Sequence, residues 1–285
     1  MIARVQTAFG LENPHSVTQL TDSEDGSAYR VWRVNRAGEQ YILKLAKAKE
    51  AANYAQYFSE PCASVPKLLA TARVDGEDYL LLEFIPGHDL MRAEREDLRL
   101  VLDALIQLQR RFCHSEDPLR SFEASLEGRK NRRNYLRENC LERVYDAYLQ
   151  AYLRMFRTLC HDDLLPFNVL VCDQRAVMID WEHAGILPYP TSVARLIAHG
   201  EEDENAFFYL KSSDKQFVID YYYDNFVKEM GISRDEYDWH MNLCLFYEYC
   251  EWVYVGNRYG NTNSQRFLHY TQKAMQMAEV LSEKI

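Results

Sequence analysis

Residues 160–184, with the sequence CHDDLLPFNVLVCDQRAVMIDWEHA, place two short apolar runs between polar rims. Residues 169–172 (VLVC) and 176–179 (AVMI) have the composition of strands, and the polar residues 173–175 between them predict a three-residue hairpin loop. From Asp89 onward the rest of the chain has helical spacing. The fold must therefore accommodate a β-hairpin within a mainly helical half.

A hairpin folded about Gln174 brings Asn168 opposite Asp180, since each lies six residues from the turn centre. Their Cβ atoms are then about 5 Å apart. An amide oxygen and a carboxylate at that separation suit Mg²⁺ that keeps part of its water and shares a phosphate chain. Asp163 precedes Asn168 by five residues and can accept a proton from a hydroxyl nucleophile. Each residue alone is as readily a strand cap or a turn residue, so this interpretation depends on the combined pattern.

The first part of the chain predicts an antiparallel sheet with one helix. Two strands joined by the turn NRAG are followed by an Ala-rich helix without Gly or Pro, and then by two more strands. These elements cover residues 27–34, 40–46, 48–59 and 65–85, the last range turning at Asp75 and Gly76.

The second part predicts a bundle of helices. The first of them, residues 95–112, gathers its apolar residues on one face at Leu98, Val101, Leu102, Leu105 and Leu108. Further helices are predicted over residues 135–155, 215–230, 239–255 and 265–281. The Pro86-Gly87 pair marks the boundary between domains 1–86 and 87–285, and the expected class is α+β.

Composition narrows the function. The net charge of −10 does not support a chain-wide basic surface for nucleic acid or an anionic membrane. Seven Cys without C-x-x-C spacing argue against a disulfide framework or a Cys-cluster zinc site. P-loop, dinucleotide, G-x-S-x-G and H-E-x-x-H motifs do not occur. The chain start has no apolar signal region, so a cytoplasmic protein is expected.

The motif H-x-D-x-x-x-x-N, followed by the hairpin and D-W-E, resembles the signature of the small-molecule branch of the protein-kinase-like fold. This branch includes aminoglycoside phosphotransferases and choline, ethanolamine, thiamine and homoserine kinases. The resemblance implies a bilobal fold with ATP and Mg²⁺ as cofactors, a nucleotide-binding lobe at residues 1–86 and a catalytic and acceptor-binding lobe at 87–285. It makes Asp163 the catalytic base and assigns Mg²⁺ to Asn168 and Asp180, with His161 positioning the catalytic loop.

The resemblance also extends to the first part of the chain. Lys44, in YILKLA, matches the third-strand Lys that contacts ATP phosphates, with Glu50 as its expected acidic partner and Glu60 as the alternative. Without the resemblance, Lys44 is better explained as an edge-strand charge that faces water.

Two further segments match the nucleotide site of the family. Gly26 and Ser27 correspond to the phosphate-covering turn, although they also suit an ordinary turn. The stretch LLLEFIPG resembles the hinge, where backbone groups near Glu83 and Ile85 would bind adenine.

The chain departs from the family at two positions. Aminoglycoside enzymes usually have Gly where this chain has Asp162, and choline-kinase-like members often have Asn, so Asp162 favours the second group. Ser192 stands where many relatives carry an Asp that supports the catalytic loop. This change leaves open how Asp163 is held, and it is the reason to consider a nucleotide-binding pseudokinase without transfer activity.

The acceptor is expected in the helical part. Residues 246–260 combine aromatic residues with Glu248 and Glu251, which suits an ammonium group, although most of these aromatics are explained equally by core packing. The candidate substrate residues are Glu182, Glu251 and Trp252. The acidic run 201–204 is interpreted as a solvated loop in preference to the alternative, the lining of an acceptor cleft for a polycation as in aminoglycoside enzymes. The basic run 129–133 is interpreted as a solvated helix start in preference to a nucleic-acid site.

The sequence thus predicts an ATP- and Mg²⁺-dependent phosphotransferase that moves the γ-phosphoryl group to a hydroxyl of a small, cationic molecule, of the choline, ethanolamine or thiamine type. The alternatives are an aminoglycoside O-phosphotransferase and the pseudokinase. A protein kinase is disfavoured, since no activation segment is recognisable after residue 182. Nucleic acid and membrane partners are not expected.

Overall fold

The computed structural model describes residues 2–21, 26–47 and 49–285. By its internal contacts the chain forms two compact units. The first unit comprises Met1–Asp89 with Phe167–His183, and the second comprises Leu90–Pro166 with Ala184–Ile285. The segment with the hairpin thus groups with the first unit, although it lies within the predicted domain 87–285.

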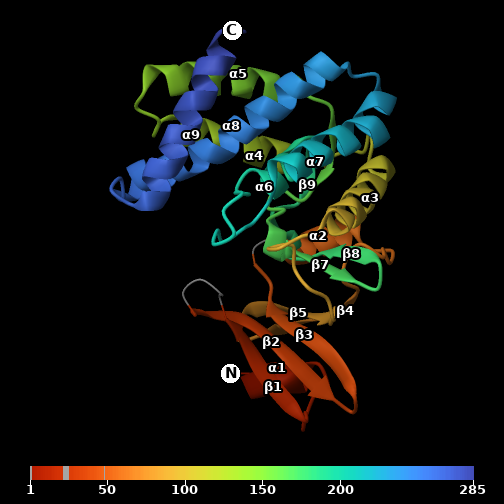
Figure 1. Ribbon diagram of the computed structural model, residues 1–285. Coiled ribbons are helices and arrows are strands. Elements are labelled where there is room, and N and C mark those ends of the chain that lie inside the picture. The colour runs from red at the N-terminus through yellow and green to blue at the C-terminus, as the bar shows by residue number, and fades with distance from the viewer. Residues whose placement is uncertain (1, 22–25, 48) are drawn as a thin grey trace. The chain divides into compact units, whose positions relative to one another are not determined.

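The first unit contains a five-stranded antiparallel sheet with the strand order β1-β2-β3-β5-β4 (Figure 1). The strands are β1 (Ser16–Thr21), β2 (Ala28–Arg36), β3 (Glu39–Leu45), β4 (Leu68–Val74) and β5 (Glu77–Glu83). The turns after β2 and β4 have two residues each, Ala37-Gly38 and Asp75-Gly76, all with positive φ. Such turns twist in the same sense as the strands they join.

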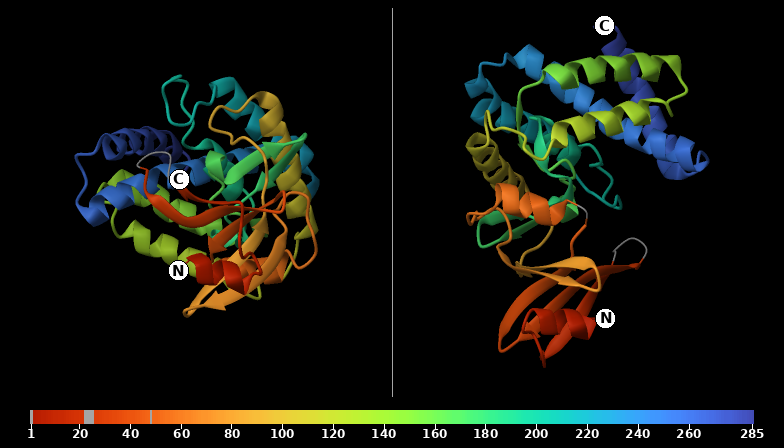
Figure 2. Two further views of the ribbon diagram at one scale, coloured as in Figure 1. Left: turned by 90° about the horizontal axis from the view of Figure 1, so that it is seen from below. Right: turned by 180° about the vertical axis from the view of Figure 1, so that it is seen from behind.

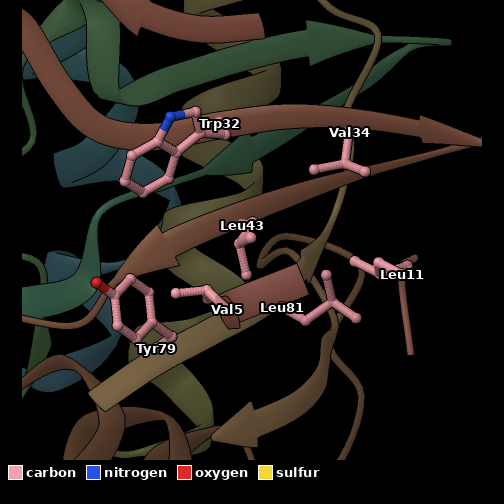
Figure 3. Close-up of a cluster of buried hydrophobic side chains, with 7 residues drawn as sticks. All are labelled: Val5, Leu11, Trp32, Val34, Leu43, Tyr79 and Leu81. Carbon is pink, nitrogen blue, oxygen red and sulfur yellow. The ribbon is translucent and has the colours of Figure 1, made fainter. Parts of the chain in front are cut away.

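Helix α1 (Ile2–Ala8) packs against this sheet. Side chains from α1 and from β2, β3 and β5 meet in one apolar cluster (Figure 3), which consists of Val5, Leu11, Trp32, Val34, Leu43, Tyr79 and Leu81. Neither α1 nor β1 was predicted, so the unit holds a second helix besides α2 (Glu50–Tyr57). The predicted range of α2 began at Ala48, which lies outside the described residues.

The hairpin of the first unit consists of β7 (Val169–Cys172) and β8 (Arg175–Met178). Its register was predicted wrongly by one residue, because Val169 pairs with Met178 through a two-residue turn. Asp173 and Gln174 have φ of 47° and 61°, which is typical of the tight type I′ turn whose twist matches the strands. Asn168 therefore lies opposite Ile179, whose N–H donates to the Asn168 carbonyl at 2.8 Å, and not opposite Asp180.

Backbone contacts hold the hairpin in its unit. His88 and Val171 exchange hydrogen bonds of 3.1 and 2.8 Å, and the Met178 N–H donates to the Ser64 carbonyl at 2.9 Å. Gly87 permits this approach, since a Cβ there would lie 2.6 Å from the Val171 oxygen.

The second unit is mainly helical, as predicted. Its helices are α3 (Arg95–Arg111), α4 (Ser121–Arg133), α5 (Asn139–Arg154), α6 (Thr191–Ile197), α7 (Ser212–Asn225), α8 (Arg234–Tyr259) and α9 (Gln265–Ser282). Helices α8 and α9 lie side by side (Figures 1 and 2). The predicted helix 215–230 divides into α7 and the 3₁₀ turn Val227–Met230. The α+β class, with an N-terminal antiparallel sheet and a mainly helical C-terminal part, is confirmed.

Four elements of the second unit were not predicted, namely the strands β6 and β9 and the helices α4 and α6. Strands β6 (Arg157–Cys160) and β9 (Gly185–Pro188) pair antiparallel, and each is only four residues long, too short for a periodic signal. Helix α4 ends with the basic run 129–133, which is therefore not a helix start. Within the described ranges, none of the helices combines the length and apolar character needed to cross a bilayer.

Candidate active site

Lys44 occupies the centre of the first unit's sheet. It lies on β3, between β2 and β5, and only 7% of its surface is exposed, which excludes the edge-strand explanation. Its Nζ lies 2.8 Å from Oε1 of Glu50 and 2.8 Å from Oδ1 of Asp180. The expected contact with Glu50 is thus present, and Lys44 also holds a candidate metal ligand.

Glu50 begins α2 directly after the loop that follows β3, which brings it to Lys44. Its side chain has no exposed surface. Burial raises the pKa of the Glu50 carboxyl, and the attraction of Lys44 opposes this rise only in part. One ammonium therefore faces two carboxyl groups in this cluster, and the excess of acid favours the addition of a cation.

Asp180 has a φ of 62°, in the left-handed region that residues other than glycine rarely adopt. The residues after it hold this conformation. Asn53 of α2 donates to the carbonyls of Trp181 at 2.7 Å and Glu182 at 3.2 Å. The Trp181 indole N–H donates to the Met178 carbonyl at 2.7 Å. Strain of this kind occurs preferentially at functional sites.

The hairpin places both candidate metal ligands at its open end. Asn168 directly precedes β7 and lies opposite Ile179, and Asp180 directly follows Ile179. Asn168 is 5% exposed. The described residues contain no group of three or more His, Cys, Asp or Glu that could hold a metal ion. An amide oxygen and one carboxylate fit Mg²⁺, which usually keeps several waters and binds substrate phosphates.

The other predicted nucleotide residues lie at the ends of strands. Gly26 has a φ of 72° and precedes β2 together with the exposed Ser27. Glu83 is the last residue of β5, and its carboxylate accepts a hydrogen bond of 3.2 Å from the Lys67 N–H. Ile85 is buried against Cys172 and Val177. No contact to a nucleotide tests these four assignments, which stay predictions.

The catalytic-loop residues His161, Asp162 and Asp163 belong to the second unit. His161 is fully buried, and its backbone N–H donates to Oγ of Ser192 at 2.9 Å. Ser192 thus accepts a hydrogen bond from the loop from the position where relatives carry Asp. Ser192 therefore still contacts the catalytic loop, although it replaces the Asp that was expected to support this loop.

Asp163 has a second support, which the sequence analysis did not identify. Arg195 donates to Oδ1 of Asp163 from Nη2 at 2.8 Å and from Nε at 3.1 Å. Ser192 and Arg195 are three residues apart on α6 and therefore share a face of the helix. The three-residue spacing could have indicated in the sequence that Ser192 and Arg195 act together. It does not indicate which loop this face of the helix contacts.

Asp162 is held by α4. It has a φ of 57°, and its Oδ1 lies 2.8 Å from Nη2 of Arg129. The Arg129 side chain is buried, with the rings of Tyr152 and Tyr247 each 4.6 Å from its guanidinium carbon. Gly and Asn, the usual family residues here, tolerate this backbone conformation well, and Asp does so to a lesser degree. The prediction that the basic run is solvated is wrong for Arg129.

The three candidate substrate residues have different neighbours within their own units, and their assignment stays a prediction. Glu251 pairs with Arg132 at 2.9 Å, and burial raises the pKa of its carboxyl. Trp252 faces other neighbours of the second unit, since it stacks on Tyr270 with a centroid distance of 5.9 Å, and the guanidinium of Arg266 lies 4.5 Å from its ring. Glu182 belongs to the first unit and contacts Lys47 at 2.9 Å and His183 at 2.7 Å.

Three residues of the acidic run 201–204 make contacts within the second unit. Glu201 contacts His269 and Lys273, Glu202 accepts from the Ser212 N–H at 2.6 Å, and Asp203 accepts from the Asn205 N–H at 2.9 Å. Three of the four acidic residues thus have a contact within the protein.

A family model for the phosphotransferase enzyme family matches residues 17–217, more than half of the chain. The chain belongs to this family. No curated protein sequence matches it. Its fold is similar to that of a thermostable mutant of aminoglycoside phosphotransferase APH(4)-Ia, with a TM-score of 0.62, 14% identity and 98% of each chain covered.

Two kinases of small metabolites have similar folds. An ethanolamine kinase from Plasmodium vivax has a TM-score of 0.62 and 11% identity over 100% of this chain and 90% of its own. A choline kinase from Cryptosporidium parvum Iowa II has a TM-score of 0.58 and 16% identity over 94% and 91% of the two chains. The prediction of the small-molecule kinase branch is confirmed, and the protein is a phosphotransferase that acts on small molecules.

Proposed function

We propose that the protein transfers the γ-phosphoryl group of ATP, in the presence of Mg²⁺, to a hydroxyl group of a small cationic molecule of the choline, ethanolamine or thiamine type. The observation that carries this proposal is the pair of 2.8 Å contacts that Lys44 makes with Glu50 and Asp180. In the kinase-like fold a Lys held in this way contacts the nucleotide phosphates. Structures with a similar fold have been solved with AMP-PNP and with ADP, which supports ATP as the donor.

In this mechanism Asn168 and Asp180 hold the metal through their side-chain oxygens. Mg²⁺ bound there supplies neutralisation of the phosphate charge. Lys44 binds phosphate oxygens, and Glu50 keeps its ammonium in place. The two carboxyl groups beside Lys44 differ in exposure, since Glu50 is fully buried and the side chain of Asp180 is 29% exposed.

Asp163 accepts the proton of the acceptor hydroxyl as that oxygen attacks phosphorus. Four residues of chain separate it from Asn168. His161 fixes the loop from the interior, through its N–H contact with Ser192. The pseudokinase alternative was motivated by the missing Asp at position 192, and the contacts of Ser192 and Arg195 with the loop weaken that motive.

The cationic acceptor rests on separate observations. The net charge of −10 favours cationic ligands, and choline and ethanolamine kinases are among the proteins of similar fold. The aminoglycoside alternative is supported by an equally similar fold. Within the acidic run, Glu201 is paired with Lys273, whereas Glu202 and Asp203 accept backbone hydrogen bonds and stay exposed, so the run does not decide between the two types of acceptor.

The test is an assay of ADP release with Mg²⁺ and a panel of choline, ethanolamine, thiamine, homoserine and several aminoglycosides. We expect turnover with one of the amino alcohols and a loss of at least about 1,000-fold in kcat for Asp163→Asn, because the amide cannot accept the proton. ATP binding, measured by calorimetry, should change less than about twofold. Full turnover of Asp163→Asn would disprove the base assignment, and ATP binding without turnover of any acceptor would support the pseudokinase.

A further inference from the structure

Arg195 connects the candidate base to the interior of the second unit. Two of its nitrogens contact one oxygen of Asp163, and its third, Nη1, lies 2.7 Å from Oε2 of Glu248 on α8. One guanidinium thus bridges a loop carboxylate and a helix carboxylate. All three residues lie within one compact unit.

The two ends of this bridge differ in exposure. The Glu248 side chain is 5% exposed, whereas those of Arg195 and Asp163 are 21% and 25% exposed. Glu248 is therefore the buried anchor, and Asp163 is the accessible end. A guanidinium has a planar and rigid set of donors, so anchoring one edge fixes the direction of the others.

His199, two residues after α6, lies beside the bridge, with its Nε2 3.4 Å from Nη1 of Arg195. His199 lies 3.7 Å from Glu248 through Nε2, and its Nδ1 lies 2.9 Å from the Tyr270 hydroxyl. Burial lowers the pKa of His199, which favours the neutral imidazole near pH 7. Arg195 is the charged contact between the two carboxylates.

We infer that Arg195 is a positioning residue that orients the Asp163 carboxylate for proton acceptance, and that Glu248 acts through Arg195 by holding it. The inference rests on the proposed function, in which Asp163 is the base. A proton acceptor must keep hydrogen-bonding distance to the reacting hydroxyl, and displacement of about 1 Å can cost 100-fold in rate. Ser192 contacts the backbone of the loop, whereas Arg195 contacts the carboxylate of Asp163 itself.

The first experiment replaces Arg195 and measures ADP release with the acceptor that supports turnover in the panel, or with water as acceptor if none does. We expect Arg195→Gln to lower kcat about 100-fold and to leave the KM for ATP within about twofold. Arg195→Lys should recover about tenfold of that loss, because it keeps the charge but not the two-nitrogen contact. If Arg195 had a purely structural role, its replacement would lower the urea midpoint and the yield of folded protein. The kcat of the folded fraction would then not fall in the order unaltered protein, Arg195→Lys, Arg195→Gln.

The second experiment tests whether Glu248 acts through Arg195. Glu248→Gln should lower kcat about tenfold, and the double variant Arg195→Gln/Glu248→Gln should be no slower than Arg195→Gln alone. The double variant also removes both buried charges together, so it folds even where Arg195→Gln leaves Glu248 unpaired and fails to fold. Additive losses in kcat would overturn the inferred order of action.

The matched control is Arg110→Gln, which removes an exposed ion pair of α3 with Glu229 at 2.7 Å. It should leave kcat unchanged. Asp163→Asn is measured in the same assay. If Asp163→Asn is inactive and Arg195→Gln keeps the kcat of the unaltered protein, the positioning role is overturned while the proposed function stands. If Asp163→Asn keeps full activity, the base assignment fails, and the role of Arg195 fails with it.

Discussion

In each unit a cation at the candidate site is shared by two carboxyl groups, and the two clusters behave differently. In the first unit Lys44 lies between Glu50 and Asp180, and in the second Arg195 lies between Asp163 and Glu248. An ammonium is a point charge on a flexible chain, and a guanidinium is a rigid fork. The first cluster therefore suits exchange of partners when a phosphate chain binds, and the second suits a fixed geometry.

The buried acids show the same difference. Burial dominates at Glu50 and raises the pKa of its carboxyl, in spite of Lys44. Burial also acts on Glu248, but Arg195 and His199 outweigh it, and the pKa of the Glu248 carboxyl lies below its ordinary value. At Glu248 the attraction of Arg195 and His199 exceeds the effect of burial on the pKa, and at Glu50 the attraction of Lys44 does not.

The largest expected effect comes from removing the shared cation of the first unit. Lys44→Met should lower kcat/KM for ATP by about 100- to 1,000-fold, because the phosphates lose their ammonium and two carboxyl groups lose their partner. Steady-state kinetics with varied ATP, together with calorimetry of ATP binding, measure this loss. Lys47→Met, which removes a contact with Glu182 at 2.9 Å, is the control and should lose less than tenfold. Equal losses for the two variants would show that Lys44 has no special role.

The two buried acids should give pH dependences of opposite sign. A carboxyl whose pKa is raised on folding stabilises the protein most below its ordinary pKa near 4.5, and this contribution falls as the pH rises through the folded value. A carboxyl whose pKa is lowered contributes above its ordinary value near 4.5, and the contribution falls as the pH drops through the folded value. Each unit of difference in pKa corresponds to about 1.4 kcal/mol.

Urea unfolding between pH 4 and pH 7 measures both dependences in Glu50→Gln and Glu248→Gln. Relative to the unaltered protein, Glu50→Gln should become more stable as the pH rises, and Glu248→Gln should become less stable. The same sign for both variants would remove the proposed difference between the clusters.

The smallest expected effect concerns the hydrogen bond from the His161 N–H to the Ser192 hydroxyl, near the cluster of the second unit. Ser192→Ala leaves the buried His161 N–H without the hydroxyl at 2.9 Å and should cost about 1–3 kcal/mol in the free energy of unfolding. Ser192→Thr keeps the hydroxyl and is the matched control. Urea unfolding at pH 7 measures both, and an unchanged midpoint for Ser192→Ala would mean that the loop does not need this contact.

Local chemistry explains which parts of the fold were predictable. The strands on either side of Asp75-Gly76 and the helix α3 follow from alternation, turn residues and the spacing of apolar side chains. The contact of Lys44 with Glu50 was expected only from the resemblance to the kinase-like fold, since local chemistry alone favoured an exposed Lys44. The register of β7 and β8 was not predictable, because it depends on whether Gln174 or the Asp173-Gln174 pair forms the turn.

The sequence by itself determined the kinase-like class, the H-x-D-x-x-x-x-N and D-W-E residues and those strands and helices that have a clear periodic pattern, since these depend on residue type and short spacing. Only the tertiary structure decided that Arg129 and Arg195 hold Asp162 and Asp163. These contacts join residues about thirty positions apart, and they depend on which helix faces pack against the loop. An Arg on a helix has the same local propensity whether its partner is water or a buried carboxylate, so no local pattern distinguishes the two.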